Sequence, residues 1–276
     1  MTDRAFRFGV VAATADTGTA WAATARHAEQ LGFDTLLVPD TLHTLAPFPA
    51  VVAAATSTTT LRAGTYVLSA PNRSPALVAW ETRTAQLLTG GRFELGLGGG
   101  RPGAERDAAA LGRDFGTPAD RLRRVEETIR AVRQEGNPPP IMVAASKPRM
   151  LRLAAEHADI VALGMPPESG EDDLGRTVAE LRAAAGGRFD ELELHLNTAV
   201  VADSVAAVPD WASRMMGGGD PRAMAAAGGI AFLLGSPAEI ADTLLRRRDA
   251  FGVSYLGVSV AFADQFAPVI ARLRGR

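Results

Sequence analysis

The sequence predicts a (β/α)8 barrel, and two observations on the chain of 276 residues point to it. Short β-branched and apolar runs alternate with longer amphipathic stretches over the whole length, and several of these runs are apolar on both alternating faces. The second pattern is typical of a parallel strand covered on both sides. Eight such strands within about 250 residues suit the barrel. A doubly wound open sheet shows the same alternation, so it stays open as the alternative.

The expected elements follow from these runs and from the capping residues between them. We expect strands at Phe6–Ala13, Thr35–Val38, Gly64–Leu68, Phe93–Leu97, Ile141–Ala144, Ile160–Leu163, Leu194–Val201 and Tyr255–Val260. We expect helices at Thr19–Leu31, Ser74–Leu88, Pro118–Gln134, Pro148–His157, Asp172–Ala185 and Pro237–Phe251. Pro75 suits a first helical turn, and Gly32 and Gly252 suit the left-handed residue that closes a helix.

Composition narrows the class of protein. The chain is 47% hydrophobic and 22% charged, as in a globular protein, and we expect one barrel domain over residues 1–276. It has no cysteine, which excludes disulfides, thiolate metal sites and a catalytic cysteine. The net charge of −2 gives no electrostatic signature for nucleic acid or an anionic membrane. No signal peptide or membrane-spanning run is recognisable, so a cytoplasmic protein is expected.

The basic residues carry a further compositional signal. Lys147 is the only lysine among 29 basic residues, and alanine, glycine and arginine are abundant. This bias indicates GC-rich coding, which suggests an actinobacterial source.

A long insertion interrupts the βα alternation at about residues 203–230, between the seventh strand and the last expected helix. Segments of this length in a compact domain are usually lids or weakly ordered loops. The insertion combines Trp211, Met215 and Met216 with three consecutive glycines. Large apolar groups on a hinge-capable backbone suit a lid over a substrate, and a weakly ordered insertion is the alternative.

Candidate site residues stand directly after the strands, because function gathers at the carboxyl ends of the strands in such barrels. The polar and small residues in these positions are Asp40, Thr41, His43, Ser69, Arg73, Gly98, Gly99, Gly100, Arg101, Ser146, Lys147 and Asp203. Together they form a polar rim around an apolar floor, as a ligand pocket requires.

The glycines after the fourth strand do not form a dinucleotide fingerprint, since Arg101 stands where the third glycine would be required. Glycine there lets a flat ligand approach the backbone closely. Ser146 and Lys147 precede a helix that opens with Pro148, so they form a candidate anion site. The alternative is a capped helix with a solvated lysine.

No metal site or nucleophile motif is recognisable. The four histidines are scattered, and His27 and His157 fall within expected helices on the solvent side. His195 is expected at the beginning of a strand, which is the stability end of a barrel. Only His43 is in a position to reach a site at the carboxyl ends of the strands.

Several segments together resemble the bacterial luciferase-like superfamily, in the branch of coenzyme F420-dependent oxidoreductases. They include AEQLGFDTLLVPD (28–40), TTTLRAGTYVLSAPNRSPALVAWE (58–81), LLTGGRFELGLGGG (87–100), PPPIMVAASKPRMLRLAAEHADIVAL (138–163) and GSPAEIADTLLRRRDAFGVSYLGVSV (235–260). The resemblance covers nearly the whole chain. It implies a (β/α)8 barrel with a deazaflavin or flavin at its carboxyl face.

The resemblance also assigns residues to the cofactor. It places Asp40 and the Ser69 hydroxyl near the ring, and it makes Tyr66-Val67 a bulge that in many members is a non-prolyl cis peptide. The remaining cofactor-binding positions are Gly99, Gly100, Arg101, Ser146 and Lys147. Two positions depart from the pattern of sugar-phosphate dehydrogenases, because Thr41 and Arg101 replace a histidine and a glutamate. Oxidation of a sugar phosphate is therefore not expected.

The expected function is hydride transfer between F420 and a C=C, C=N or C=O bond of a small, mostly apolar substrate. A reduced-FMN-dependent monooxygenase is the first alternative, and a non-catalytic cofactor-binding relative is the second. The expected proton donor is His43, with water as the alternative. A homodimer is possible, since dimers are frequent in the family.

Overall fold

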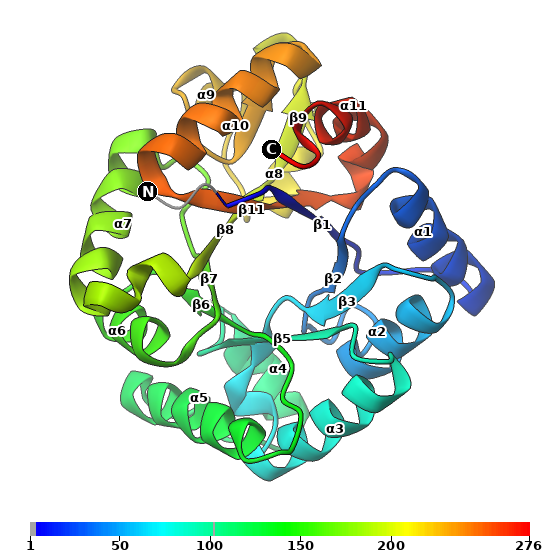
Figure 1. Ribbon diagram of the computed structural model, residues 1–276, viewed down its shortest axis with the longest axis vertical. Helices are drawn as coiled ribbons and strands as arrows, with labels where there is room; N and C mark the ends of the chain where they lie inside the picture. The colour runs from blue at the N-terminus through cyan, green and yellow to red at the C-terminus, as the bar shows by residue number, and fades with distance from the viewer. Residues whose placement is uncertain (1–3, 102) are drawn as a thin grey trace.

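The molecule is a closed parallel β-barrel, seen in a computed structural model that describes residues 4–101 and 103–276 (Figure 1). Its strands are β1 (Arg7–Val11), β2 (Thr35–Val38), β3 (Arg62–Thr65), β4 (Leu68–Ser69), β5 (Phe93–Gly98), β6 (Ile141–Ala145), β7 (Ile160–Leu163), β8 (Glu193–Thr198) and β11 (Val253–Ser259). They pair in the order β3-β2-β1-β11-β8-β7-β6-β5-β4, and a further pairing of β3 with β5 closes the barrel. The predicted fold is confirmed, and an open sheet is excluded.

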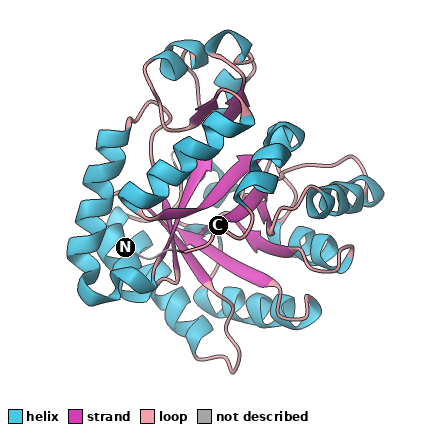
Figure 2. Cartoon of the chain, turned by 45° about the horizontal axis from the view of Figure 1, so that its top comes forward, coloured by secondary structure: helices cyan, strands magenta, loops and turns pink. Residues whose placement is uncertain are grey.

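Helices surround the barrel (Figure 2). They are α1 (Gly18–Gln30), α2 (Pro47–Thr56), α3 (Pro75–Leu88), α4 (Ala104–Ala110), α5 (Pro118–Arg133), α6 (Pro148–His157), α7 (Glu171–Ala185), α8 (Ala212–Met215), α9 (Pro221–Ala226), α10 (Pro237–Phe251) and α11 (Ala263–Leu273). All six predicted helices are present. None of the helices in the described residues is both long and apolar enough to cross a membrane.

The sequence signals at the helix ends correspond to real caps. Ser236 and Glu239 form a reciprocal capping box at the start of α10, and Gly252 closes this helix with a φ of 81°. Two long helices were missed for a physical reason. In α2, with the sequence PFPAVVAAAT, apolar residues surround the whole helix, so no amphipathic stripe marks it. In α11, an internal Pro268 hides the pattern.

Two strand predictions need correction. The third strand was expected at Gly64–Leu68, but β3 ends at Thr65 and a separate β4 resumes at Leu68. The seventh was expected at Leu194–Val201, but β8 ends at Thr198, and β9 (Val200–Ala202) instead pairs with β10 (Phe232–Leu234) in a small sheet. Because β8 begins at Glu193, His195 lies within the strand rather than at its beginning.

The insertion contains regular structure. Between β9 and β10 it forms a short 3-10 turn (Val205–Ala207) and the helices α8 and α9. It lies beside α10 and α11, on the side of the barrel formed by β8 and β11 (Figure 1).

A cluster of buried ion pairs fills the amino-terminal end of the barrel. Arg7 of β1 lies 2.7 Å from a Glu94 carboxylate oxygen and 3.0 Å from Glu193, and Arg62 lies 2.8 Å from Glu94. Burial alone would raise the pKa of Glu94, but the Arg7 and Arg62 guanidiniums outweigh it and hold that pKa below its usual range. The charges therefore sit at the end of the barrel remote from the predicted site.

Replacement of Glu94 by Gln should lower the free energy of unfolding by about 3 kcal/mol at neutral pH, because Arg62 then loses its buried carboxylate partner and Arg7 keeps only Glu193. The penalty should shrink below about pH 4.3, since the wild-type carboxylate contributes stability above the pKa of unfolded glutamate and loses it as the pH falls toward the lowered folded value. Urea unfolding of both proteins at neutral and acid pH measures this. Glu126→Gln, which breaks an exposed pair with Arg130, is the control. An equal penalty at both pH values would contradict the prediction.

Candidate active site

A cavity of about 380 Å³ opens at the carboxyl ends of five neighbouring barrel strands. It is lined by Pro39, Asp40, Thr41, Tyr66, Val67, Leu68, Ser69, Gly98, Gly99, Gly100, Arg101, Ala144, Ala145, Ser146 and Gly164. These residues follow or end β2, the interrupted strand β3/β4, β5, β6 and β7. The structure thus brings together eight of the nine predicted cofactor-binding residues around one cavity, and the ninth, Lys147, adjoins it.

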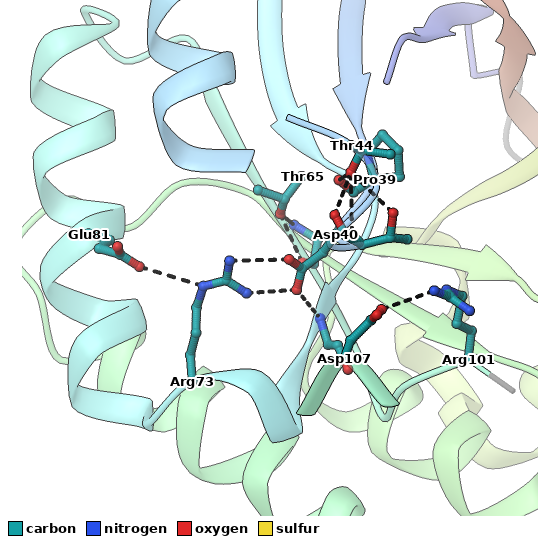
Figure 3. Close-up of polar contacts among 11 residues, drawn as sticks. Pro39, Asp40, Thr44, Thr65, Arg73, Glu81, Arg101 and Asp107 are labelled. Carbon is teal, nitrogen blue, oxygen red and sulfur yellow. Dashed lines mark hydrogen bonds and ion pairs between the residues drawn. The ribbon is translucent and has the colours of Figure 1, made fainter. Parts of the chain in front are cut away.

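An ion pair fixes the wall of the cavity after β2 (Figure 3). Asp40 is bound by both guanidinium nitrogens of Arg73, at 2.7 and 3.1 Å, and its Oδ2 accepts a hydrogen bond of 2.9 Å from the backbone N–H of Ser69. Arg73 also lies 3.9 Å from Glu81, the pKa of which is raised by burial and by the nearby Asp40 charge. Asp40 therefore ties β2 to β4, and Arg73 faces Asp40 rather than open solvent.

The floor of the cavity is the break between β3 and β4. The peptide bond between Tyr66 and Val67 is cis, which confirms the expectation for this bulge. Thr65 anchors the break, because its hydroxyl donates to the carbonyl of Gly96 at 2.9 Å and accepts from the N–H of Gly96 at 2.8 Å. Tyr66 is half-buried, and burial raises the pKa of its hydroxyl. The phenol is therefore neutral at physiological pH.

Glycines after β5 leave the cavity open to a flat ligand. A Cβ at Gly98 would lie 2.8 Å from Val67, and one at Gly100, where φ is 93°, would lie 2.8 Å from Phe115. Ser69 is buried beside this turn, and its hydroxyl has no hydrogen-bond partner in the described residues. A buried hydroxyl without a partner at a cavity wall is suited to bond a ligand.

Arg101 reaches the opposite rim of the cavity and is positioned by α4. Its guanidinium lies 3.0 Å from a carboxylate oxygen of Asp107, which is itself buried (Figure 3). Asp107 was not predicted from the sequence, because α4 is too short for a periodic signal.

A second cavity of about 560 Å³ continues outward from the first. Both are lined by Gly99, Gly100, Ala144 and Ser146, and the outer one adds the cations Arg121, Lys147, Arg149 and Arg152. Arg121 donates a hydrogen bond of 2.8 Å to the Gly116 carbonyl, and none of the four cations makes an ion pair with a described residue. We call these four cations the basic groove. Only Lys147 was predicted, although the spacing of Arg149 and Arg152 on the first turns of α6 could have indicated them.

The start of α6 lies in the basic groove and has no side-chain cap. Lys147 occupies the capping position, and its side chain cannot accept a hydrogen bond from the first backbone N–H groups. Those N–H groups and the adjacent cations are therefore available to an anion. The interpretation of this segment as an anion site gains support over that of a capped helix with a solvated lysine.

The remaining predicted residues lie elsewhere. His43 is exposed on the loop after β2 and does not line either cavity. Trp211 stacks on Phe262 with ring centroids 5.3 Å apart and, with Asp203, lines a separate cavity of about 310 Å³. Met216 packs against the hydrophobic core, and the side chain of Met215 lies outside the described part of the structure. No group of metal-ligating side chains occurs in the residues that the structure describes.

Sequence comparison assigns the family. The sequence model described as luciferase-like monooxygenase matches residues 6–135 and 132–254, which together make up most of the chain. The chain belongs to the luciferase-like monooxygenase family. Members of this family are oxidoreductases or monooxygenases, and the resemblance inferred from the sequence is confirmed at this level.

Two curated relatives each match only about half of the chain, at 28–30% identity. A phthiodiolone/phenolphthiodiolone dimycocerosates ketoreductase of Mycobacterium tuberculosis is 30% identical over 198 residues, which are 55% of this chain and 51% of that protein. A 5,10-methylenetetrahydromethanopterin reductase of Methanolobus tindarius is 28% identical over 179 residues, or 56% of this chain and 53% of that protein. The chain spans about half the length of the curated relatives it matches.

Solved structures share the fold over almost the whole chain. The coenzyme F420-dependent tetrahydromethanopterin reductase of Methanopyrus kandleri superposes with a TM-score of 0.75 at 16% identity, covering 98% of this chain and 99% of that one. A long-chain alkane monooxygenase superposes with a TM-score of 0.75 at 14% identity, covering 99% and 92%. At these identities the likeness extends to the fold alone.

Replacement of Arg73 by Met should lower the free energy of unfolding by about 3 kcal/mol, because it leaves the buried Asp40 carboxylate without its partner. The double variant Asp40→Asn/Arg73→Met should lose less than the sum of the two single losses, since the two side chains act as a pair. Chemical denaturation measures both effects. Arg83→Met removes an exposed arginine from α3, the helix that follows Arg73, and serves as the control. Strictly additive losses would contradict the pairing.

Proposed function

We propose that this protein is an F420-dependent oxidoreductase that acts on a small, largely apolar organic substrate. The single observation that carries the proposal is the continuity of two unlike cavities. One has an apolar, glycine-rich wall suited to a flat ring, and the other is the basic groove. A molecule that fills both must join a planar ring to a chain of several negative charges.

The residues present fit such a cofactor. The first cavity offers the Tyr66-Val67 floor, the open glycine turn and the unpartnered Ser69 hydroxyl. F420 carries a phosphate and a polyglutamate tail, and the basic groove offers four cations and uncapped N–H groups to them. FMN carries a single phosphate and would leave most of these cations unused.

When bound, reduced F420 supplies a hydride from C5 of its deazaflavin to a C=C, C=N or C=O bond. The protein would contribute binding, orientation and exclusion of water. Asp40 and Arg73 neutralise each other, and Arg101 is paired with Asp107, so these ion pairs keep the ring cavity nearly neutral overall. A near-neutral cavity favours an apolar substrate over a charged one. The F420-dependent secondary alcohol dehydrogenase that shares this fold is compatible with such chemistry.

A reduced-FMN-dependent monooxygenase is the alternative function, favoured by the long-chain alkane monooxygenase and by a riboflavin lyase solved with modified FMN, which share the fold. Oxygen dependence separates the two functions, because only the monooxygenase requires oxygen. Turnover under strict anaerobiosis with any defined substrate would exclude both this alternative and a non-catalytic relative.

Fluorescence titration of the purified protein with F420 and with FMN tests the cofactor directly. We expect F420 to bind at least tenfold more tightly than FMN, because only F420 reaches all the cations of the basic groove. The ratio of the F420 affinity to the FMN affinity should fall as salt is added, since the basic groove is exposed and salt screens its charges. Tight binding of FMN without binding of F420 would overturn the assignment.

Replacement of Lys147 by Ala should weaken F420 binding about fivefold, the effect of roughly 1 kcal/mol from one exposed charge. FMN binding should change less if its phosphate lies nearer the ring. Isothermal titration calorimetry measures both affinities. Arg26→Ala, which removes an exposed arginine from α1 without touching the groove, is the matched control. An F420 affinity unchanged within about twofold would mean that the tail does not bind at Lys147.

Replacement of His43 by Ala should alter kcat by less than about twofold, because the exposed imidazole does not line the cavity and water can supply the proton. The pH profile of kcat should keep its shape for the same reason. Steady-state kinetics over a range of pH values measures both. A loss of about 100-fold, the usual effect of removing a general acid, would instead make His43 the proton donor.

A further inference from the structure

The inner face of β8 carries buried polar groups without partners. His195 is fully buried, and neither of its ring nitrogens has a hydrogen bond within the described residues. Two positions along the same face, the Oδ1 atom of Asn197 is also buried and unpaired. Leaving such groups unpaired is costly, and their presence in a folded protein calls for a specific cause.

These groups lie in the part of the barrel mouth that the ring cavity leaves free. The cavity uses the ends of β2, of the interrupted strand β3/β4 and of β5–β7, and the remaining strands are β8, β11 and β1. Asn197 lies near the carboxyl end of β8 and is half-buried, with its Oδ1 atom on the buried side. His195 lies one level deeper, with its ring 5.0 Å from that of Tyr66, which forms the cavity floor.

A glycine makes room for both side chains. Gly257 of β11 is in register with Asn197, and a Cβ built there would lie 2.7 Å from Nε2 of His195 and 2.9 Å from Oδ1 of Asn197. Nε2 of His195 and Oδ1 of Asn197, the two unpaired atoms, therefore lie next to the same point. The two atoms are not hydrogen-bonded in the described structure, so a side-chain rotation is needed for an N–H at Nε2 to donate to Oδ1. With Oδ1 in that bond, the NH₂ of the same amide is the donor that stays available.

This part of the barrel is electrically neutral. Burial, together with the positive charge of Arg7, lowers the pKa of His195 to about 3, so its imidazole is uncharged at physiological pH. The charged groups that face it from the packed strands are Arg7, Glu94 and Glu193, and they pair with one another at the closed end of the barrel. Tyr66 and Tyr255, the titratable rings in contact with it, are both held neutral by burial.

We propose that Asn197 is a specificity-determining residue that donates a hydrogen bond to the carbonyl oxygen of a neutral, largely apolar substrate. His195 is a positioning residue that holds the Asn197 amide from below through Nε2. The inference rests on the proposed function, since the bound carbonyl faces the ring cavity across the barrel. It gives Nε2 of His195 and Oδ1 of Asn197 a common hydrogen bond, and it selects against carboxylates because the cations described in the barrel interior, Arg7 and Arg62, lie at its closed end.

The test uses three probes of one size: acetophenone, ethylbenzene and benzoate. Their binding is measured by NMR on the cofactor-free protein and again on the protein saturated with cofactor. We expect acetophenone to bind at least tenfold more tightly than the other two and to shift the side-chain amide signals of Asn197. In Asn197→Leu and His195→Phe, this preference should fall to within about twofold. Ser259→Ala, which changes a hydroxyl on the neighbouring strand, should keep the preference.

Two further readouts separate this role from a structural one. The ¹⁵N signals of His195 should report a neutral ring protonated at Nε2, and the cofactor affinity of Asn197→Leu should stay within twofold of the wild type. The proposal would be overturned if Asn197→Leu bound acetophenone as tightly as the wild type does. It would also be overturned if the wild type bound benzoate more tightly than acetophenone, or did not bind acetophenone. Failure of F420 to bind would refute the proposed function separately, because the measurement on the cofactor-free protein would still decide the role of Asn197.

Discussion

The candidate site depends on one constraint in the barrel wall, the contact between Thr65 and Gly96. The backbone leaves β3 after Thr65 and resumes pairing at Leu68, and the excursion between them forms the cavity floor. A Cβ at position 96 would lie 2.0 Å from the carbonyl oxygen of Thr65, so only glycine lets β5 approach this closely. The two hydrogen bonds of the Thr65 hydroxyl hold the approach in place. The cavity is thus a consequence of how the barrel closes.

Charged side chains are distributed unevenly between the two cavities, with paired charges at the inner cavity and a row of cations along the outer one. The ion pairs of the interior lie at the amino-terminal end, and Asp40 at the carboxyl end is neutralised by Arg73. The basic groove, whose cations Lys147, Arg149 and Arg152 have no ion pair with the described residues, lies farther out at the start of α6. Under the proposed function this arrangement separates two tasks, with binding energy from the basic groove and selection of the substrate by the apolar interior.

Membership of the family limits the reaction to those of oxidoreductases or monooxygenases, but it does not identify the cofactor. Proteins that share this fold include an F420-dependent tetrahydromethanopterin reductase, an F420-dependent secondary alcohol dehydrogenase and a long-chain alkane monooxygenase, so the barrel itself does not identify the reaction. In this chain the loops at the carboxyl ends of the strands carry Thr41 and Arg101 at the inner rim and the basic groove at the outer rim, and the proposal of a polyanionic cofactor rests on the basic groove.

The sequence by itself determined the barrel, the six amphipathic helices and most of the residues around the ring cavity. Strand periodicity and βα alternation are local properties, and parallel strands bring their carboxyl ends together, so residues such as Asp40, Ser69 and Ser146 could be grouped without coordinates. The tertiary structure alone decided what these residues contact. In the structure Arg73 pairs with Asp40, and His43 is exposed to solvent. Trp211 stacks on Phe262, away from the ring cavity. It also put His195 inside the barrel beneath Tyr66, because one residue more or less at the start of a strand decides which side chains face inward. Such contacts join residues far apart in the chain, and no local pattern records them.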